Sequence, residues 1–349
     1  MKVEIHSPTI RRKEMDAVLT AMVEEKIGPG ERSKLLIQTA KEQLGFDYAL
    51  ALRSPAVALH IALSALNVKT GQAVVISALS PRYYLQVLND LQLTPLYCDT
   101  TYDFPCMNRE LIENTISRKQ DDVQVCAVVL HHTLGFVPDT AAIAELGFPV
   151  IEDISQSYGS WLLKEAAQPK TDNVFCIIGL EERDMLTSGG GALLFAMNRK
   201  EGSLLRNFSD ITNEYCLPDI NAALAIVQFK EIQRNIERRR DIADVFVHAS
   251  LSLASRTKHK RFIAANENEY CNYSFSLVLE TGLKDVITYA KKKEIEIENA
   301  FENTIANTGV CHDCPVSNSL VLRTVIFPMY PRLRSQDVER ISRLIMTLP

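Results

Sequence analysis

Residues 123–153 read VQVCAVVLHHTLGFVPDTAAIAELGFPVIED. Two mostly apolar runs, 123–130 and 149–151, each end at polar residues, the first at His131-His132 and the second at Glu152-Asp153. Apolar runs without strict alternation are typical of parallel strands that are buried on both faces. The stretch therefore predicts two strands of a covered sheet, with polar side chains at their carboxyl ends.

The same alternation of strands and helices extends to both sides of this stretch. Further strands are predicted at 48–52, 73–76, 94–97, 174–178 and 192–195. Helices are predicted at 11–26, 34–44 and 55–66, and a long helix from 219 through 240 and beyond. This order favours an α/β fold with a mostly parallel sheet, whose sites form at the carboxyl ends of the strands. Such ends carry Asp99, His131, His132 and Asp153.

The pattern changes after about residue 262. A strand at 274–279, a helix at 283–293 and a last helix from about 335 follow. A length of 349 residues also suggests two domains rather than one. We therefore expect a large domain with an N-terminal helical segment over 1–240, and a smaller C-terminal α/β domain over 241–349.

Composition narrows the class of protein. With 46% hydrophobic residues and a net charge of -5, the chain resembles a globular protein and not a dedicated binder of nucleic acid or membrane surfaces. The N-terminus lacks the apolar stretch of a secretory signal, and no apolar run approaches the roughly 20 residues of a membrane helix. Eight scattered cysteines indicate reduced thiols, so we expect a cytoplasmic protein.

One cysteine pair has a suggestive spacing. Cys311-His312-Asp313-Cys314 matches the spacing of a zinc knuckle or of a redox pair. A structural zinc site needs four ligands, and the sequence offers no second pair of this kind. We therefore predict a loop of reduced thiols and no metal site.

Six short segments, read in order along the chain, carry a family resemblance. They are SPAVALH (54–60), TPLYCD (94–99), LHHTLG (130–135), PVIEDISQ (149–156), TSGGG (187–191) and FPMYP (327–331). Their order and spacing resemble the sugar aminotransferases of the DegT/StrS type, which are fold-type-I enzymes that use pyridoxal phosphate. The resemblance covers nearly the whole chain. It implies a large domain around a mostly parallel sheet, a smaller C-terminal α/β domain, and a homodimer with sites at the subunit interface.

The resemblance also implies a lysine that forms an imine with the cofactor, a few residues before the glycines at 189–191. Residues 174–188 contain no lysine. Counting back from the glycines places Arg183 at the lysine position, and counting forward from Asp172 places Glu182 there. A guanidinium and a carboxylate both lack an imine-forming amine, so we predict no catalytic residue at this position.

The positions that would hold the cofactor are altered too. In the family a Ser-Gly-Thr helix start binds the phosphate, whereas this chain has Ser54, Pro55 and Ala56. Proline lacks the N–H and alanine lacks the hydroxyl. Asp153 matches the carboxylate that pairs with the pyridinium, and Gln156 matches the residue near the phenolic oxygen. We predict a remnant cofactor site of Asp153, Gln156, Ser54 and Ala56. Alternatively, Asp153 only ends a strand and caps the next turn.

Other family positions differ as well. The aromatic ring that stacks on the pyridine aligns near Pro81, which leaves Tyr83 and Tyr84 close by but out of register. The arginine and asparagine that the neighbouring subunit contributes in the family align near Cys216 and Glu214. These differences add to the loss of the lysine.

A second type of reaction occurs in the family that this sequence resembles. Its 3-dehydratases replace the lysine with histidine and hold pyridoxamine phosphate without an imine. The lysine stretch here has no histidine, although Glu182 offers a base there if it is not simply a loop residue facing solvent.

Together these observations predict a degenerate homologue of nucleotide-sugar aminotransferases, without transaminase activity, in amino-sugar or surface-polysaccharide biosynthesis. It would be a homodimer with a nucleotide-sugar ligand, with no cofactor or only non-covalent pyridoxal or pyridoxamine phosphate, and with no nucleic-acid or membrane partner. The alternative is an active aminotransferase or dehydratase that uses either cofactor on a nucleotide-linked keto-sugar. Charge disfavours a nucleic-acid-binding derivative.

Overall fold

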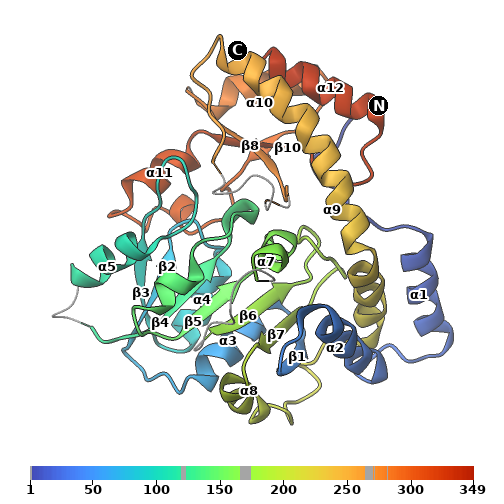
Figure 1. Ribbon diagram of the computed structural model, residues 1–349, viewed down its shortest axis with the longest axis vertical. Helices are drawn as coiled ribbons and strands as arrows, with labels where there is room; N and C mark the ends of the chain where they lie inside the picture. The colour runs from blue at the N-terminus through green and yellow to red at the C-terminus, as the bar shows by residue number, and fades with distance from the viewer. Residues whose placement is uncertain (1, 119–122, 166–173, 264–269, 271, 281) are drawn as a thin grey trace.

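A computed structural model describes residues 2–118, 123–165, 174–263, 270, 272–280 and 282–349. A seven-stranded sheet forms the centre of the larger part of the molecule (Figure 1). Its strands are β1 (Tyr48–Leu52), β2 (Ala73–Ser77), β3 (Thr94–Cys98), β4 (Val125–His131), β5 (Val150–Asp153), β6 (Val174–Gly179) and β7 (Ala192–Ala196). The strand order is β1-β7-β6-β5-β4-β2-β3.

The sheet is mostly parallel, as the sequence predicted. Strands β2 to β6 are parallel to one another, and β7 is antiparallel to both β1 and β6. Every residue of β2, β5, β6 and β7 is buried, which explains their nearly continuous apolar sequences. The carboxyl ends of β4 and β5 lie together, with His131 paired in register with Asp153.

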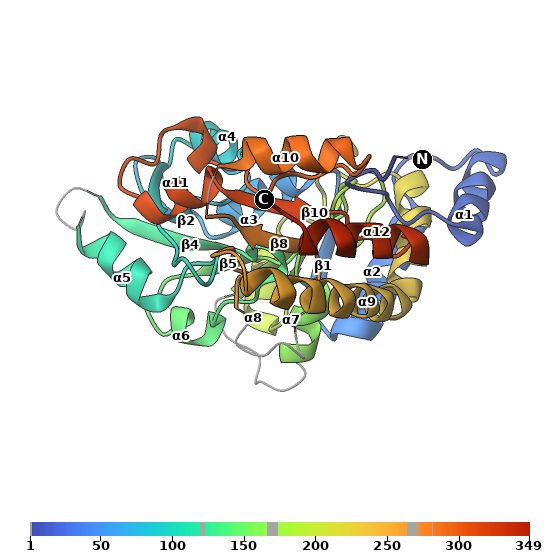
Figure 2. The ribbon, with the colours of Figure 1, turned by 90° about the horizontal axis from the view of Figure 1, so that it is seen from above.

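Helices cover both faces of this sheet. The helices of this part are α1 (Arg12–Val23), which packs on α9 and not on the sheet, and α2 (Glu31–Leu44), α3 (Pro55–Ala65), α4 (Tyr83–Asp90), α5 (Arg109–Ser117), α6 (Thr140–Ala144), α7 (Tyr158–Glu165), α8 (Arg199–Arg206) and α9 (Asp219–Ala254). Residues of α2, α5, α6, α7 and α9 share one apolar core, and residues of α3, α4 and α8 share the other. Figure 2 shows α3 and α4 on one side of the sheet and α6 and α7 on the other.

The C-terminal part contains a smaller, three-stranded antiparallel sheet. Its strands are β8 (Phe275–Val278), β9 (Glu298–Asn299) and β10 (Thr324–Phe327), in the order β8-β10-β9. The accompanying helices are α10 (Leu283–Lys292), α11 (Pro315–Val321) and α12 (Ser335–Met346). Residues of α10 and α12 pack with these strands and the end of α9 in a third core. The N-terminal segment joins this part, because Val3 bridges to Ile295.

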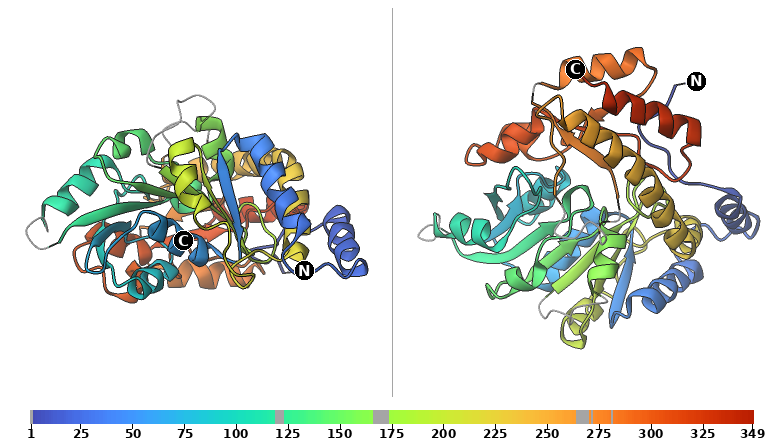
Figure 3. Two further views of the ribbon diagram at one scale, coloured as in Figure 1. Left: turned by 90° about the horizontal axis from the view of Figure 1, so that it is seen from below. Right: turned by 45° about the horizontal axis from the view of Figure 1, so that its top comes forward.

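Helix α9 links the two sheets without a break. It has 36 residues, contacts α1, α2 and α12, and runs from beside the large sheet into the smaller part (Figure 3). The expected domain division, 1–240 and 241–349, falls inside this helix and stays a prediction. Ser54 and Pro55 begin α3 as expected, with the Ser54 hydroxyl accepting a hydrogen bond from the Val57 N–H. Among the described residues, no helix has the length and apolarity that a membrane span requires.

A buried polar network fixes the end of β5. The Glu152 carboxylate accepts hydrogen bonds from the Trp161 indole at 3.2 Å and from the Thr140 hydroxyl. His132 bridges Glu152 at 3.1 Å and the Ser157 hydroxyl at 2.6 Å. Burial alone would raise the pKa of Glu152, but the hydrogen bonds from His132, Thr140 and Trp161 outweigh it and lower the pKa. The network therefore stabilises the charged carboxylate inside the core.

Replacing Glu152→Gln is expected to lower the free energy of unfolding by about 3 kcal/mol, because buried donors would lose their charged acceptor. Urea denaturation at neutral pH measures this loss. The folded pKa of Glu152 is lowered, so its stabilisation is present near neutral pH and disappears as pH falls through that pKa. The difference between the variant and the native protein should therefore shrink in acid.

The matched control is Glu145→Gln, an exposed glutamate in an ion pair with Arg109. It should cost less than about 1 kcal/mol. Equal losses in the two variants would contradict a special role for the buried network.

Candidate functional site

The predicted site residue Asp153 lies at the carboxyl end of β5 and is 2% exposed. Its Oδ2 atom accepts hydrogen bonds from the hydroxyls of Tyr83 at 3.0 Å and Tyr84 at 2.7 Å. Its Oδ1 atom accepts hydrogen bonds from the Ser155 N–H at 3.1 Å and the Ser155 hydroxyl at 2.5 Å. A carboxylate has about four acceptor positions, so protein donors fill this one.

The two tyrosines are neighbours at the start of α4, and their rings pack edge to face with centroids 4.9 Å apart. Burial, followed by the charge of Asp153, raises the pKa of both phenols well above the ordinary value. Tyr83 and Tyr84 therefore remain neutral hydrogen-bond donors at physiological pH. The sequence alignment placed them out of register with the ring-stacking position, and it did not predict that they would contact Asp153.

The stretch 174–188 contributes a second carboxyl group to this region. The Ser155 hydroxyl also accepts a hydrogen bond from the Gly179 N–H at 2.7 Å. A Cβ atom on Gly179 would lie 2.3 Å from Oδ2 of Asp184 and 2.7 Å from the Ser155 hydroxyl, so a side chain at 179 would collide with both. Asp184 Oδ2 accepts a hydrogen bond from the Glu181 N–H at 2.8 Å, and burial raises the pKa of Asp184 well above its ordinary value.

A cavity of about 530 Å³ opens beside these groups, between the carboxyl ends of the large sheet and the smaller sheet. The polar and charged residues that line it include His131, Thr133, Gln156, Glu181, Glu182, Arg183, Asp184, Glu298, Asn299, Glu302, Asn303 and Thr304. Its apolar walls include Leu79, Pro81 and Phe301. The cavity lining therefore combines many hydrogen-bonding side chains with a few apolar ones.

Carboxylates dominate the charge of this cavity. Its described lining residues include four glutamates, Asp184 and one arginine. The raised pKa of Asp184 favours its neutral form, and Glu298 is paired with Arg183, so the negative charge comes mainly from Glu181, Glu182 and Glu302. Burial lowers the pKa of His131 to about 4, and its Nδ1 is hydrogen-bonded to the Thr133 hydroxyl at 3.0 Å, so the imidazole is neutral at physiological pH. The cavity favours neutral or cationic groups over phosphates, by simple Coulomb attraction and repulsion.

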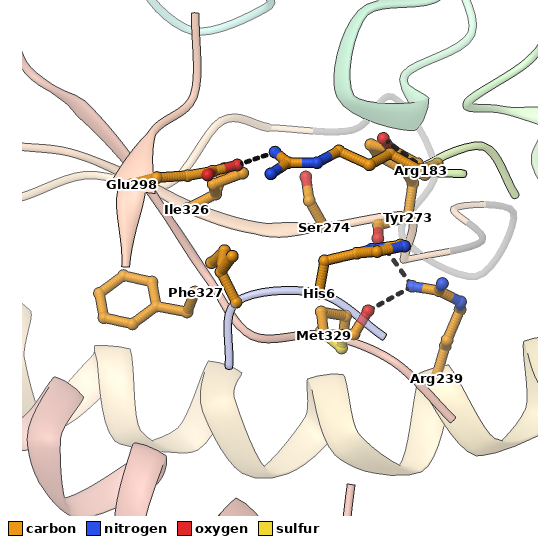
Figure 4. A pocket seen from close by; sticks show the side chains of 10 residues that line it. His6, Arg183, Arg239, Tyr273, Ser274, Glu298, Ile326, Phe327 and Met329 are labelled. Atoms are coloured by element: carbon orange, nitrogen blue, oxygen red, sulfur yellow. Dashed lines mark hydrogen bonds and ion pairs between the residues drawn. The ribbon is translucent and has the colours of Figure 1, made fainter. Parts of the chain in front are cut away.

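Both candidates for the lysine position line the cavity, but neither points an amine into it. The Arg183 guanidinium forms an ion pair with Glu298, and the Arg183 carbonyl accepts a hydrogen bond from the Tyr273 hydroxyl at 2.9 Å (Figure 4). Glu182 is exposed, and its carbonyl is hydrogen-bonded to His6 Nε2 at 2.7 Å. The loop is thus held by contacts to the N-terminal segment and the smaller sheet.

Below this ion pair lies a smaller pocket of about 60 Å³. Figure 4 shows Arg239 of α9 entering it from below, where the guanidinium donates to the carbonyls of Tyr273 at 2.8 Å and Met329 at 2.6 Å. Arg239 therefore ties the long helix to both segments that flank the smaller sheet.

Of the four residues predicted as a remnant cofactor site, Gln156 lines the cavity, whereas Ser54 and Ala56 do not. Gln156 lines it and accepts a hydrogen bond from the Leu134 N–H at 2.8 Å. Ser54 and Ala56 lie at the start of α3 and are not among the described residues that line it. Asp153 is covered by the two tyrosines. The four residues predicted as a remnant site therefore do not form one open cup.

These residues do not fit pyridoxal phosphate as the family binds it. A pyridinium nitrogen would need a free acceptor on Asp153, and protein donors occupy all four positions. The α3 start offers Pro55 where an N–H is needed and Ala56 where a hydroxyl is needed. The sequence did contain a signal for this filling, namely two consecutive tyrosines shortly after the carboxyl end of β2.

Solved structures share this fold. The aminotransferase from Psychrobacter cryohalolentis superposes with a TM-score of 0.83 at 15% identity, covering 97% of this chain and 96% of that chain. A DegT DnrJ EryC1 StrS aminotransferase from Brucella abortus gives 0.81 at 20% identity, with 95% and 94% covered. A variant of GDP-4-keto-6-deoxymannose-3-dehydratase gives 0.80 at 14% identity, with 98% and 100% covered.

At these identities the likeness establishes the architecture, and it confirms the predicted α/β fold of the pyridoxal-phosphate aminotransferases. The family itself follows from the sequence, which a family profile matches almost from end to end, over residues 8–346. The resemblance read from the six segments is thereby confirmed. The chain belongs to the DegT/DnrJ/EryC1/StrS aminotransferase family.

Proposed function

We propose that this chain is a degenerate member of its family that binds a sugar ligand without transaminating it, in amino-sugar or surface-polysaccharide biosynthesis. The observation that carries the proposal is the filled carboxylate of Asp153, whose oxygens accept hydrogen bonds from Tyr83, Tyr84 and Ser155. Asp184, beside Gly179, adds a carboxyl group to the same region. Residues 174–188 supply no amine for an imine.

Incubation with pyridoxal phosphate, followed by dialysis, is expected to leave no cofactor absorbance, because neither the amine nor the pyridinium acceptor is available. Borohydride reduction and peptide mass spectrometry then search for pyridoxyl on any lysine.

The double variant Tyr83→Phe/Tyr84→Phe removes both hydroxyls that donate to Asp153. It should lower the free energy of unfolding by about 2 kcal/mol, because a buried carboxylate loses two donors.

Stoichiometric trapping of pyridoxyl on one lysine of the native protein would contradict this proposal. The alternative, an active enzyme with non-covalent pyridoxal or pyridoxamine phosphate, requires two results together. The protein must retain the cofactor through dialysis, and it must turn over a nucleotide-linked keto-sugar. The same purified sample therefore decides between the two functions.

The cavity supports a sugar as the ligand. Amide, hydroxyl and carboxylate side chains bind sugar hydroxyls by hydrogen bonds, and Phe301 provides an apolar surface beside them. Glu181, Glu182 and Glu302 repel a diphosphate placed inside the cavity. We therefore propose that the sugar part of a nucleotide sugar occupies the cavity and that its diphosphate lies outside.

Nucleotide sugars are expected to raise the melting temperature by a few degrees at saturating concentration, and the free nucleoside diphosphate is not, because only the sugar fits the cavity. Thermal shift assays with a panel of nucleotide sugars and their nucleotides measure this difference. Asn303→Leu should abolish the shift, and Asn307→Leu, at an exposed position outside the cavity lining, should preserve it. Equal shifts with sugar and free nucleotide would refute the assignment.

A homodimer forms a further part of the proposal. One face of α1 exposes four apolar side chains, Met15, Leu19, Met22 and Val23, each at least 54% exposed. The opposite face packs on α9, where Gln228 donates to Glu14 at 3.1 Å. An exposed apolar stripe of this kind fits a subunit interface.

We also propose a cytoplasmic location, consistent with the free thiols of the described cysteines.

Leu19→Lys/Val23→Lys is expected to convert a dimer to a monomer, because two charges would be buried at the interface. Light scattering after size exclusion gives the mass. Leu251→Lys is the matched control, since Leu251 and Leu19 are both 58% exposed. A dimer that persists in the double variant, or a native protein that is monomeric, would contradict the role of α1.

A further inference from the structure

The turn that contains Cys311 and Cys314 lies outside the cavity lining and has no part in the proposed function. It connects a short 3-10 helix, Ala306–Thr308, to α11. The Cys314 N–H donates to the Cys311 carbonyl at 3.2 Å, so the two residues close an i to i+3 turn. Residues that close such a turn have Cα atoms less than about 7 Å apart, within the span of a disulfide.

The two thiols share this turn and differ in their surroundings. The Cys314 thiol donates to the Tyr97 carbonyl at 3.6 Å. The hydrogen bond from Cys314 lowers the pKa of Cys311, and the same bond raises the pKa of Cys314. Cys311 is therefore the better nucleophile of the pair, and Cys314 is its proton-bearing partner.

The two cysteines are buried within a turn whose neighbouring residues are exposed. Cys311 is 1% exposed and Cys314 is fully buried, but Gly309, Val310, His312 and Asp313 around them are exposed. Gly309 has a φ of 81°, a left-handed conformation that favours glycine and sets the direction of the turn. A local opening of this short turn therefore exposes Cys311 to a small solute without unfolding the core.

We propose that Cys311 and Cys314 form a dithiol site that low-molecular-weight disulfides, such as oxidised glutathione, convert reversibly to an intramolecular disulfide. The Cys311 thiolate attacks one sulfur of the oxidant, which forms a mixed disulfide and releases one molecule of reduced thiol after protonation. The Cys314 sulfur then attacks Cys311, loses its proton to solvent and releases the second reduced thiol. The protein loses two electrons and two protons, and the oxidant gains both.

A metal site is the other chemistry that this spacing suggests. A closed zinc site needs four ligands. Over the described part of the chain, no group of three or more histidine, cysteine, aspartate or glutamate side chains is arranged to hold a metal. Asp99, the nearby carboxylate, instead caps α11 by accepting hydrogen bonds from the N–H groups of Val316 at 2.9 Å and Ser317 at 2.7 Å. The geometry favours the dithiol.

The test uses the native full-length protein in glutathione buffers of increasing oxidised fraction, followed by alkylation with N-ethylmaleimide and trypsin digestion. Cleavage after Lys293 and Arg323 yields the peptide 294–323, which contains Cys311 and Cys314 and no other cysteine. Oxidation should give this peptide without maleimide and about 2 Da lighter than its reduced form. Dithiothreitol should restore two alkylation sites.

Serine variants distinguish the roles of the two thiols. Cys314→Ser should stop the reaction at a glutathione adduct on Cys311, and Cys311→Ser should leave Cys314 unmodified. Cys216→Ser, at a half-buried cysteine elsewhere, is the control and should oxidise at 294–323 like the native protein. Two maleimide adducts on the peptide from oxidised native protein would overturn the proposal, as would a Cys314 disulfide with Cys98.

Discussion

The carboxylate of Asp153 is the constraint on which the site depends. It is buried at the end of a central strand, where an unpaired charge would be costly. Any sequence that keeps this aspartate must supply donors for its oxygens. Here the donors are Tyr83, Tyr84 and Ser155, all from the chain itself. With these groups in place, donors of the chain itself fill the acceptor positions of the buried carboxylate.

The fold and the site respond to different physical requirements. The large sheet is held by apolar strands and by helices on both faces, and two of its core residues, Tyr84 and Trp161, also donate hydrogen bonds to carboxylates at the end of β5. The Glu152 network and the Asp153 network lie side by side on β5, and both satisfy buried charges internally.

Much of the fold could be predicted from the sequence, because buried strands and helix starts leave local patterns. The run at 192–195 and the Ser54-Pro55 start of α3 are examples, and both match the structure within a residue. The filling of the site could not be predicted in the same way. It depends on Tyr83 and Asp184 reaching groups that are distant in sequence, and alignment to the family assigned neither of them a role. The two consecutive tyrosines at 83 and 84 are visible in the sequence, but their hydrogen bonds to Asp153 are not.

The unbroken helix α9 limits how the two sheets can move relative to one another. Hinged closure of two domains requires residues that absorb large changes in backbone torsion angles. The helix that joins the two sheets is unbroken over 36 residues, and Arg239 fastens its middle to the carbonyls of Tyr273 and Met329. Any movement of one sheet relative to the other therefore has to bend this helix or break the hydrogen bonds of Arg239.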